Sequence, residues 1–100
     1  MIDVAQEHLE SIKKIFQKFI PERRVLAFGS RINGKSTKHS DFDLVIMGDE
    51  CVYNKSMAML EYAFQESEIP FRIDLIEWAT TSEPFRKIIL SDHVEIQSVK

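Results

Sequence analysis

The sequence of 100 residues has little cysteine and no long apolar run. Cys51 is the single cysteine, which excludes an internal disulfide, and with no export signal at the start we expect a reducing cytoplasm. The longest hydrophobic runs are four residues, at 25–28, 44–47 and 57–60, whereas a membrane-spanning helix needs about 20. Three glycines and three prolines form no linker or low-complexity segment, so we expect one soluble domain over residues 1–100.

What is present is the mixture of a globular protein, with 44% hydrophobic and 29% charged residues and a formal net charge of −3. A net acidic chain is not typical of proteins that coat nucleic acid, so no DNA partner is expected. The charges are unevenly ordered, because residues 23–40 contain five Lys or Arg and no acid, and Asp41, Asp43, Asp49 and Glu50 follow. Basic residues that lead into paired acids suit an anionic ligand that arrives with a divalent cation.

Hydrophobic periodicity and turn residues predict a small α+β domain. Helices are predicted at residues 3–19, at 53–67 and, after a cap at Thr81 or Ser82, through Leu90. Strands are predicted at residues 24–28, 41–47, 71–76 and 94–97. Asp3 is expected to cap the first helix, with Gln6 completing a capping box. Residues 29–40 are predicted as a loop with one helical turn after Ser30. This loop is too short for a crossover helix, so we expect the first two strands to be antiparallel and the sheet to be mixed, with helices packed against it.

Three aspartates carry the strongest chemical signal. Asp41 and Asp43 are two apart in a predicted strand, so both side chains point to one face, and Asp74 lies within the third predicted strand. If that strand neighbours the second, Asp74 joins the other two. A carboxylate buried without a partner costs several kcal/mol, so three of them on adjacent strands indicate a metal, and oxygen ligands favour Mg²⁺ or Mn²⁺ over zinc. Glu77 is out of phase with Asp74 along the strand, so its side chain should face away from the metals.

Structural alternatives stay open for each aspartate. Asp41 alone is also typical of the start of a strand, and the pair with Asp43 is typical of the solvent face of an edge strand. For Asp74, the structural alternative to a metal role is a salt bridge with Arg72 or Arg24.

Gly29 and Ser30 follow a predicted strand and open a tight loop. Glycine lets the backbone approach a ligand closely, and serine offers a hydroxyl as well as its N–H. A helix that begins here would direct free N–H groups at an anion, which suits the phosphates of a nucleoside triphosphate. Taken alone, Gly-Ser is also typical of an ordinary turn.

The combined pattern is Gly29-Ser30, ten residues, and then Asp41-x-Asp43. It resembles the signature of the DNA polymerase β-like nucleotidyltransferase superfamily, and the short form GSRxxG…SDxDL is similar to the minimal, MntA-type nucleotidyltransferases. The resemblance implies the nucleotidyltransferase fold and two catalytic Mg²⁺ ions, or Mn²⁺, held by Asp41 and Asp43. Asp74 matches the third carboxylate, which holds one metal and helps to deprotonate the attacking hydroxyl.

By the same resemblance, Gly29 and Ser30 would hold the triphosphate and Arg31 would neutralise it. Larger relatives carry a further domain that grips the base or the acceptor, and we expect no such domain in this chain. The resemblance therefore implies a helical HEPN-type partner encoded nearby, commonly a toxin ribonuclease, to whose tyrosine AMP is transferred from ATP so that the enzyme acts as antitoxin. Transfer to a small molecule, a non-catalytic module that neutralises its partner by occlusion, the base preference and a homodimer stay open.

Overall fold

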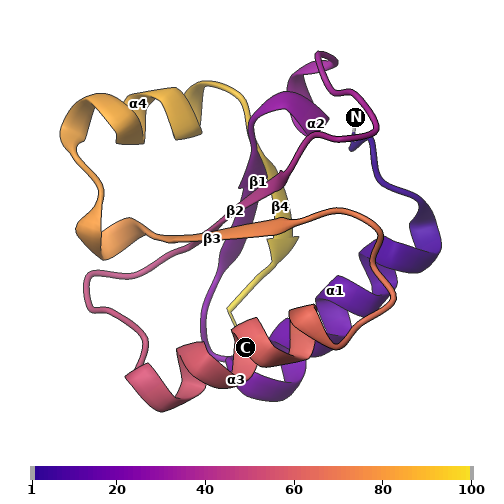
Figure 1. Cartoon of the computed structure of the whole chain (residues 1–100). Helices are drawn as coiled ribbons and strands as arrows, with labels where there is room; N and C mark the ends of the chain where they lie inside the picture. The colour runs from indigo at the N-terminus through magenta and orange to yellow at the C-terminus, as the bar shows by residue number, and fades with distance from the viewer. Residues whose placement is uncertain (1, 100) are drawn as a thin grey trace.

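A computed structural model describes residues 2–99, which build a four-stranded mixed sheet with helices on both faces (Figure 1). The elements are α1 (Gln6–Phe19), β1 (Val25–Phe28), α2 (Ser30–Asn33), β2 (Phe42–Ile46), α3 (Asn54–Gln65), β3 (Ile73–Glu77), the 3₁₀ turn η1 (Trp78–Thr80), α4 (Glu83–Ser91) and β4 (Val94–Gln97). This order and the mixed sheet confirm the predicted α+β class. Among residues 2–99, no helix combines the length and the apolar character needed to cross a bilayer.

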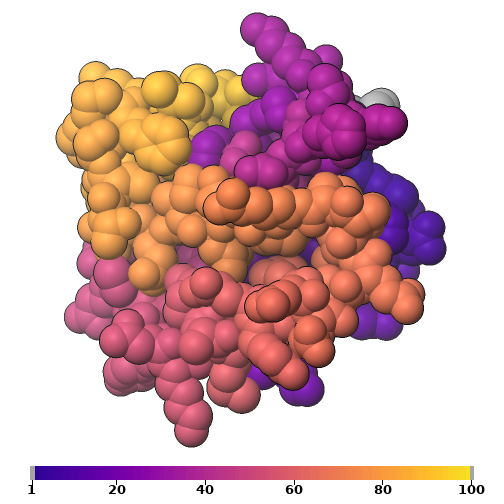
Figure 2. All heavy atoms as spheres, in the orientation of Figure 1, coloured from indigo at the N-terminus to yellow at the C-terminus, as the bar shows by residue number. Residues whose placement is uncertain are grey.

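The strand order is β3-β2-β1-β4, so the two strands that carry the candidate aspartates are neighbours. β1 pairs antiparallel with both β2 and β4, while β2 and β3 run parallel. The short link through α2 allows the antiparallel pair, whereas the parallel pair needs the long crossover through α3. β4 and β3 form the two edges, and β3 lies across the molecular surface above α3 (Figure 2).

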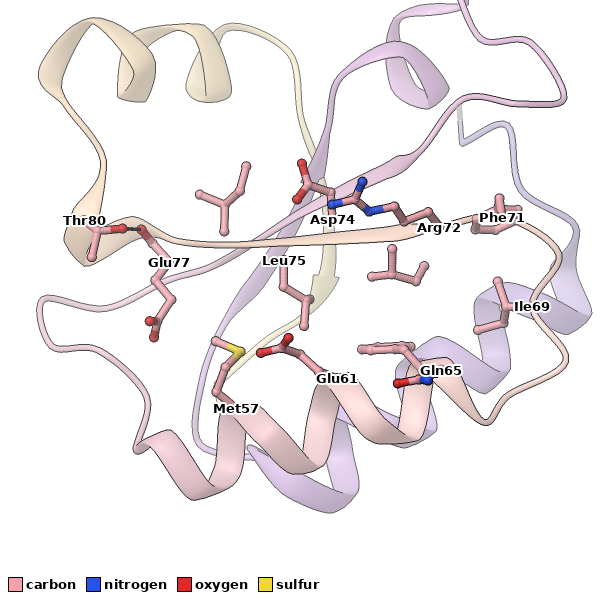
Figure 3. A pocket seen from close by; sticks show the side chains of 13 residues that line it. Met57, Glu61, Gln65, Ile69, Phe71, Arg72, Asp74, Leu75, Glu77 and Thr80 are labelled. Carbon is pink, nitrogen blue, oxygen red and sulfur yellow. Dashed lines mark hydrogen bonds between the residues drawn. The ribbon is translucent and has the colours of Figure 1, made fainter.

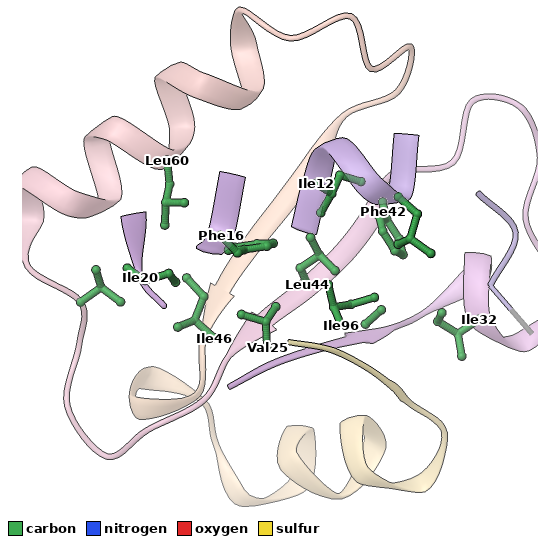
Figure 4. Close-up of a cluster of buried hydrophobic side chains, with 13 residues drawn as sticks. Ile12, Phe16, Ile20, Val25, Ile32, Phe42, Leu44, Ile46, Leu60 and Ile96 are labelled. Carbon is green, nitrogen blue, oxygen red and sulfur yellow. The ribbon is translucent and has the colours of Figure 1, made fainter. Parts of the chain in front are cut away.

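The main core lies between the sheet and the helices α1 and α3 (Figure 4). α1 buries Leu9, Ile12 and Phe16 at the three- and four-residue spacings of one helix face. Phe16 packs edge-to-face against Phe64 of α3, with ring centroids 5.3 Å apart. Leu60 of α3 is fully buried in the same core.

The opposite face of the sheet carries a smaller cluster beneath α4, composed of Leu26, Phe28, Val45 and Ile89. Because strand side chains alternate, Asp43 shares this face with Val45, and Asp74 shares it with Ile76, which packs against the same cluster. The two aspartates are therefore directed away from the α1 and α3 core, on the face where α4 covers only part of the sheet (Figure 1).

Several predicted element starts differ from those in the structure. α1 begins at Gln6 with Ala5 at the N-cap position, so Asp3 does not cap it. Instead, the Asp3 N–H donates to the carbonyl of Arg31 at 2.7 Å, and its carboxylate accepts from the Ser36 hydroxyl. These contacts hold Asp3 beside the loop that follows α2 and leave the capping role unfilled.

Strand β2 begins at Phe42, so Asp41 lies one residue before it, and β3 runs from Ile73 to Glu77 rather than over residues 71–76. At α4 the cap is Ser82, whose hydroxyl accepts from the Phe85 N–H at 3.4 Å, as predicted. The predicted helical turn after Ser30 is confirmed as α2.

Candidate active site

Asp43 and Asp74 stand side by side on the parallel strands β2 and β3. They are direct register partners, and neighbouring strands lie about 4.8 Å apart. β2 is a central strand, so the alternative of an acidic edge strand is wrong. Within residues 2–99, no Lys, Arg or His makes an ion pair with Asp74, and Arg24 pairs with Glu95 instead at 2.5 Å. We call these two carboxyls the aspartate pair.

The aspartate pair is electrostatically costly in the absence of a cation. The pKa of Asp43 is raised from 3.8 to about 6, first because the carboxyl is partly buried and then because the charge of Asp74 lies beside it. A hydrogen bond with Asp74 and the more distant charge of Asp41 act in the same direction. A site of this kind favours bound positive charge.

Asp41 lies at the entrance to β2, two residues before Asp43. It contributes the smallest of the four effects that raise the pKa of Asp43. In the described part of the chain, no three acidic, histidine or cysteine side chains converge on one point as a ready ligand cluster. The arrangement is therefore a facing pair, Asp43 and Asp74, with a third carboxylate at the strand end.

Gly29 connects β1 to α2 and lies directly against the aspartate pair. Its φ of +84° is in the left-handed region, where a side chain is strained. A Cβ at this position would lie 3.1 Å from Asp43 Cγ and would overlap its Oδ2. The carbonyl of Gly29 accepts the N–H groups of Ile32 and Asn33, which starts α2. Gly29 and Ser30 are thus placed beside Asp43.

Arg31 is buried and bonded to backbone rather than open to a ligand. Its side chain is 7% exposed, and the guanidinium donates to the carbonyl oxygens of Ser40 at 3.0 Å and Asp3 at 2.9 Å. It also stacks on the ring of Phe71, 4.2 Å from the ring centroid. Because Ser40 directly precedes Asp41, Arg31 fixes the loop that delivers Asp41 to the site. Asp3 and Phe71 were not identified from the sequence as its partners, since they are remote along the chain.

A groove of about 850 Å³ adjoins Asp74, between the free edge of β3 and helix α3 (Figure 3). We call it the β3 groove; its lining is residues 71–77 together with Met57, Glu61, Phe64, Gln65, Ile69 and Thr80. Figure 3 shows Asp74 on the side of the strand away from α3 and Glu77 on the side toward it, as their spacing predicted. Glu77 accepts the Val52 N–H at 2.5 Å. No sequence signal distinguished Glu61 from an ordinary solvated helix residue.

The model of the family described as polymerase beta, nucleotidyltransferase, matches residues 10–99. The chain belongs to the polymerase β nucleotidyltransferase family. Members of this family generally use a divalent metal ion, and the side chains of Asp41, Asp43 and Asp74 offer oxygen atoms alone. A curated relative in Haemophilus influenzae, named "Probable protein adenylyltransferase MntA", is 46% identical over 96 residues, which are 96% of this chain and 84% of the relative.

Solved structures share the nucleotidyltransferase fold. A chain of a toxin–antitoxin crystal structure with AMP-PNP superposes with a TM-score of 0.74 and 18% identity, over 92% of this chain and 74% of that chain. A chain from the complex of a tri-AMPylated Shewanella oneidensis HEPN toxin with its MNT antitoxin gives a TM-score of 0.68 and 18% identity, over 94% and 72%. At this identity the likeness establishes the shared fold.

Proposed function

We propose that this nucleotidyltransferase transfers AMP from ATP to a tyrosine hydroxyl of a helical HEPN-type partner encoded nearby, and that it acts in this way as the partner's antitoxin. The observation that carries the proposal is the aspartate pair, with the backbone of Gly29 packed against Asp43. The 46% identical relative supports the AMP-transfer chemistry. Because ATP is the donor, we place the reaction in the cytoplasm.

The donor set suits a hard cation, because it consists of carboxylate oxygens whose mutual repulsion raises the pKa of Asp43. Asp41, Asp43 and Asp74 would hold Mg²⁺, two ions in our proposal, with Mn²⁺ able to substitute. When bound, the ions supply positive charge to the attacking and leaving oxygens.

The chain's own groups bind, orient and accept a proton. The phenolic oxygen of the acceptor attacks the α-phosphorus of ATP, the bond from that phosphorus to the oxygen bridging to the β-phosphorus breaks, and pyrophosphate leaves with the electron pair. Asp74 lies on the outer strand of the pair and accepts the phenolic proton. The backbone at Gly29 and Ser30 borders the triphosphate, and Arg31 acts as a positioning residue for the loop before Asp41.

A transfer assay tests this proposal. The chain, the purified partner, Mg²⁺ and ATP labelled at the α-phosphate are incubated, and label in the partner is measured. We expect label with the natural chain and with Asp49→Asn, an exposed acid outside the site, and none with a folded Asp43→Asn variant. Near-normal labelling by Asp43→Asn would refute the assignment.

Occlusion is retained as a second candidate because α3 and the residue before it expose Tyr53, Met59 and Tyr62, at 86%, 44% and 64%. Such a surface is able to bind and cover a partner without transferring a nucleotide to it. The two functions differ in one measurement. Equal neutralisation of the partner by the natural chain and by Asp41→Ala would favour occlusion, whereas loss of neutralisation in Asp41→Ala supports transfer.

A further inference from the structure

The β3 groove follows the edge of a strand rather than one face of the sheet. All seven residues from 71 to 77 line it, although successive side chains of a strand point to opposite faces. A depression lined in this way must run along the outer backbone of β3. β3 is an edge strand, and its five residues are all only partly buried, in contrast to the buried apolar positions of β2.

The outer backbone groups of β3 are identifiable from its pairing. The carbonyl of Arg72 accepts the Phe42 N–H at 2.9 Å, so the even-numbered residues direct their backbone groups at β2. The alternation then directs the N–H and C=O groups of Ile73, Leu75 and Glu77 to the free edge. These groups are able to pair with one further extended strand.

The groove also lies on the acceptor side of the aspartate pair. Across the sheet the order is Gly29 at the end of β1, Asp43 on β2, Asp74 on β3, and then the groove. In the proposed reaction the triphosphate lies at Gly29 and the acceptor hydroxyl at Asp74. The acceptor must therefore approach from beyond β3, which is where the groove is.

The charge of the groove selects its occupant. Apart from Asp74, which would hold the metal, its ionisable lining is two acids, Glu61 and Glu77, against one base, Arg72. Figure 3 shows Glu61 reaching from α3 toward β3. Apolar side chains, among them Met57 and Phe64, lie on the α3 side of the same groove.

We propose that the acceptor protein presents its hydroxyl residue on an extended, basic segment that pairs with the free edge of β3 in this groove. This inference rests on the proposed function and adds how the acceptor docks. In an added strand, alternate side chains point to opposite faces, so the hydroxyl residue lies beside Asp74 while its two neighbours point between β3 and α3. The acceptor sequence should therefore carry apolar residues on either side of the modified hydroxyl and Lys or Arg nearby.

The test compares two charge reversals on one helix, Glu61→Arg in the groove and Glu66→Arg at the exposed C-cap outside it. Label transfer from ATP to the neighbouring-gene partner is measured over a range of partner concentrations. We expect Glu61→Arg to raise the KM for the partner about tenfold and to leave kcat and the KM for ATP unchanged. A charge at the edge of an interface mainly affects the rate at which the two proteins associate. Glu66→Arg should match the natural chain.

Hydrogen exchange provides a second readout that does not depend on any variant. The natural chain is mixed with the partner in EDTA, so that no transfer occurs. We expect the amides of Ile73, Leu75 and Glu77 to gain protection, with those of the other edge strand, β4, unchanged.

The outcomes separate the two proposals. If the natural chain labels no partner, the proposed function fails. If it labels the partner but Glu61→Arg behaves like Glu66→Arg and the β3 amides stay unprotected, the docking inference alone is overturned. Protection of the β3 edge by a second copy of this chain, detected as a dimer in sedimentation, or transfer of label to an aminoglycoside in place of the protein, overturns it as well.

Discussion

Replacing Asp43 by Asn should stabilise the metal-free protein while it abolishes AMP transfer. The folded chain binds a proton at Asp43 more tightly than the unfolded chain does, because the pKa rises from 3.8 to about 6 on folding. Stability that depends on this proton is fully present below pH 4 and is lost as the pH rises through 6. Asn carries no charge at any pH and avoids that loss.

The magnitude follows from the size of the pKa change. A rise from 3.8 to about 6 corresponds to about 3 kcal/mol of unfolding free energy above pH 7. Asp43 is only partly buried, so solvent screening reduces the effect, and we take about half, ~1.5 kcal/mol. In a domain of this size 1 kcal/mol shifts Tm by about 4–8 °C, which predicts a gain of about 6–12 °C for Asp43→Asn at pH 8.

The assay is thermal unfolding in EDTA at pH 8 and pH 4, with Asp49→Asn as the control that removes an exposed aspartate outside the site. The gain of Asp43→Asn over this control should nearly vanish at pH 4, where both chains are neutral at position 43. Added Mg²⁺ should stabilise the natural chain more than Asp43→Asn. A gain that is absent at pH 8, or that persists unchanged at pH 4, would refute the electrostatic reasoning.

Three further substitutions probe the surroundings of Asp43. Gly29→Ala should lose transfer activity, whereas Gly34→Ala should keep it. Both glycines have a φ above +80°, but only a Cβ at position 29 would meet Asp43. Equal activity of the two folded variants would contradict this. Asp74→Asn should lower the pKa of Asp43 in a carbon-13 NMR titration yet leave it above 3.8, because burial is the largest cause; an unchanged pKa would show that the charges do not interact. Arg31→Lys should lower the free energy of unfolding in urea by about 2–3 kcal/mol, because an ammonium group cannot reproduce both hydrogen bonds and the stacking. A loss below about 1 kcal/mol would argue against the positioning role.

The period of two along a strand predicted that Asp41 and Asp43 share one face, and that Asp74 joins them if the third strand neighbours the second. Strand pairing is a long-range property, so the parallel register that places Asp74 beside Asp43 came from the structure. The predicted opposite orientation of Glu77 rests on the same alternation. The family signature added the chemistry, because Gly29 at +84° against Asp43 is a contact that a Gly-Ser dipeptide alone does not specify.

What the sequence could not indicate depends on contacts between remote positions. Asp3 resembles a helix cap locally, but its pairing with Arg31 and Ser36 determines where it lies. Arg31 follows the phosphate motif, and its burial under Phe71 becomes visible only once the start of β3 is in place. The β3 groove likewise depends on how α3 packs beneath the strand, which no local pattern encodes.

The crossover through α3 has a consequence for how the protein comes into being. Gly29, Asp43 and Asp74 belong to three strands, and the central strand β1 also requires β4, whose last residue is Gln97. No contiguous fragment that ends before β3 contains the site, and the repelling carboxyls meet only after the crossover from β2 to β3 has closed. During synthesis, therefore, a nascent chain has no complete nucleotidyltransferase site until β3 and β4 have been made, and a chain truncated before β3 cannot compete for nucleotide.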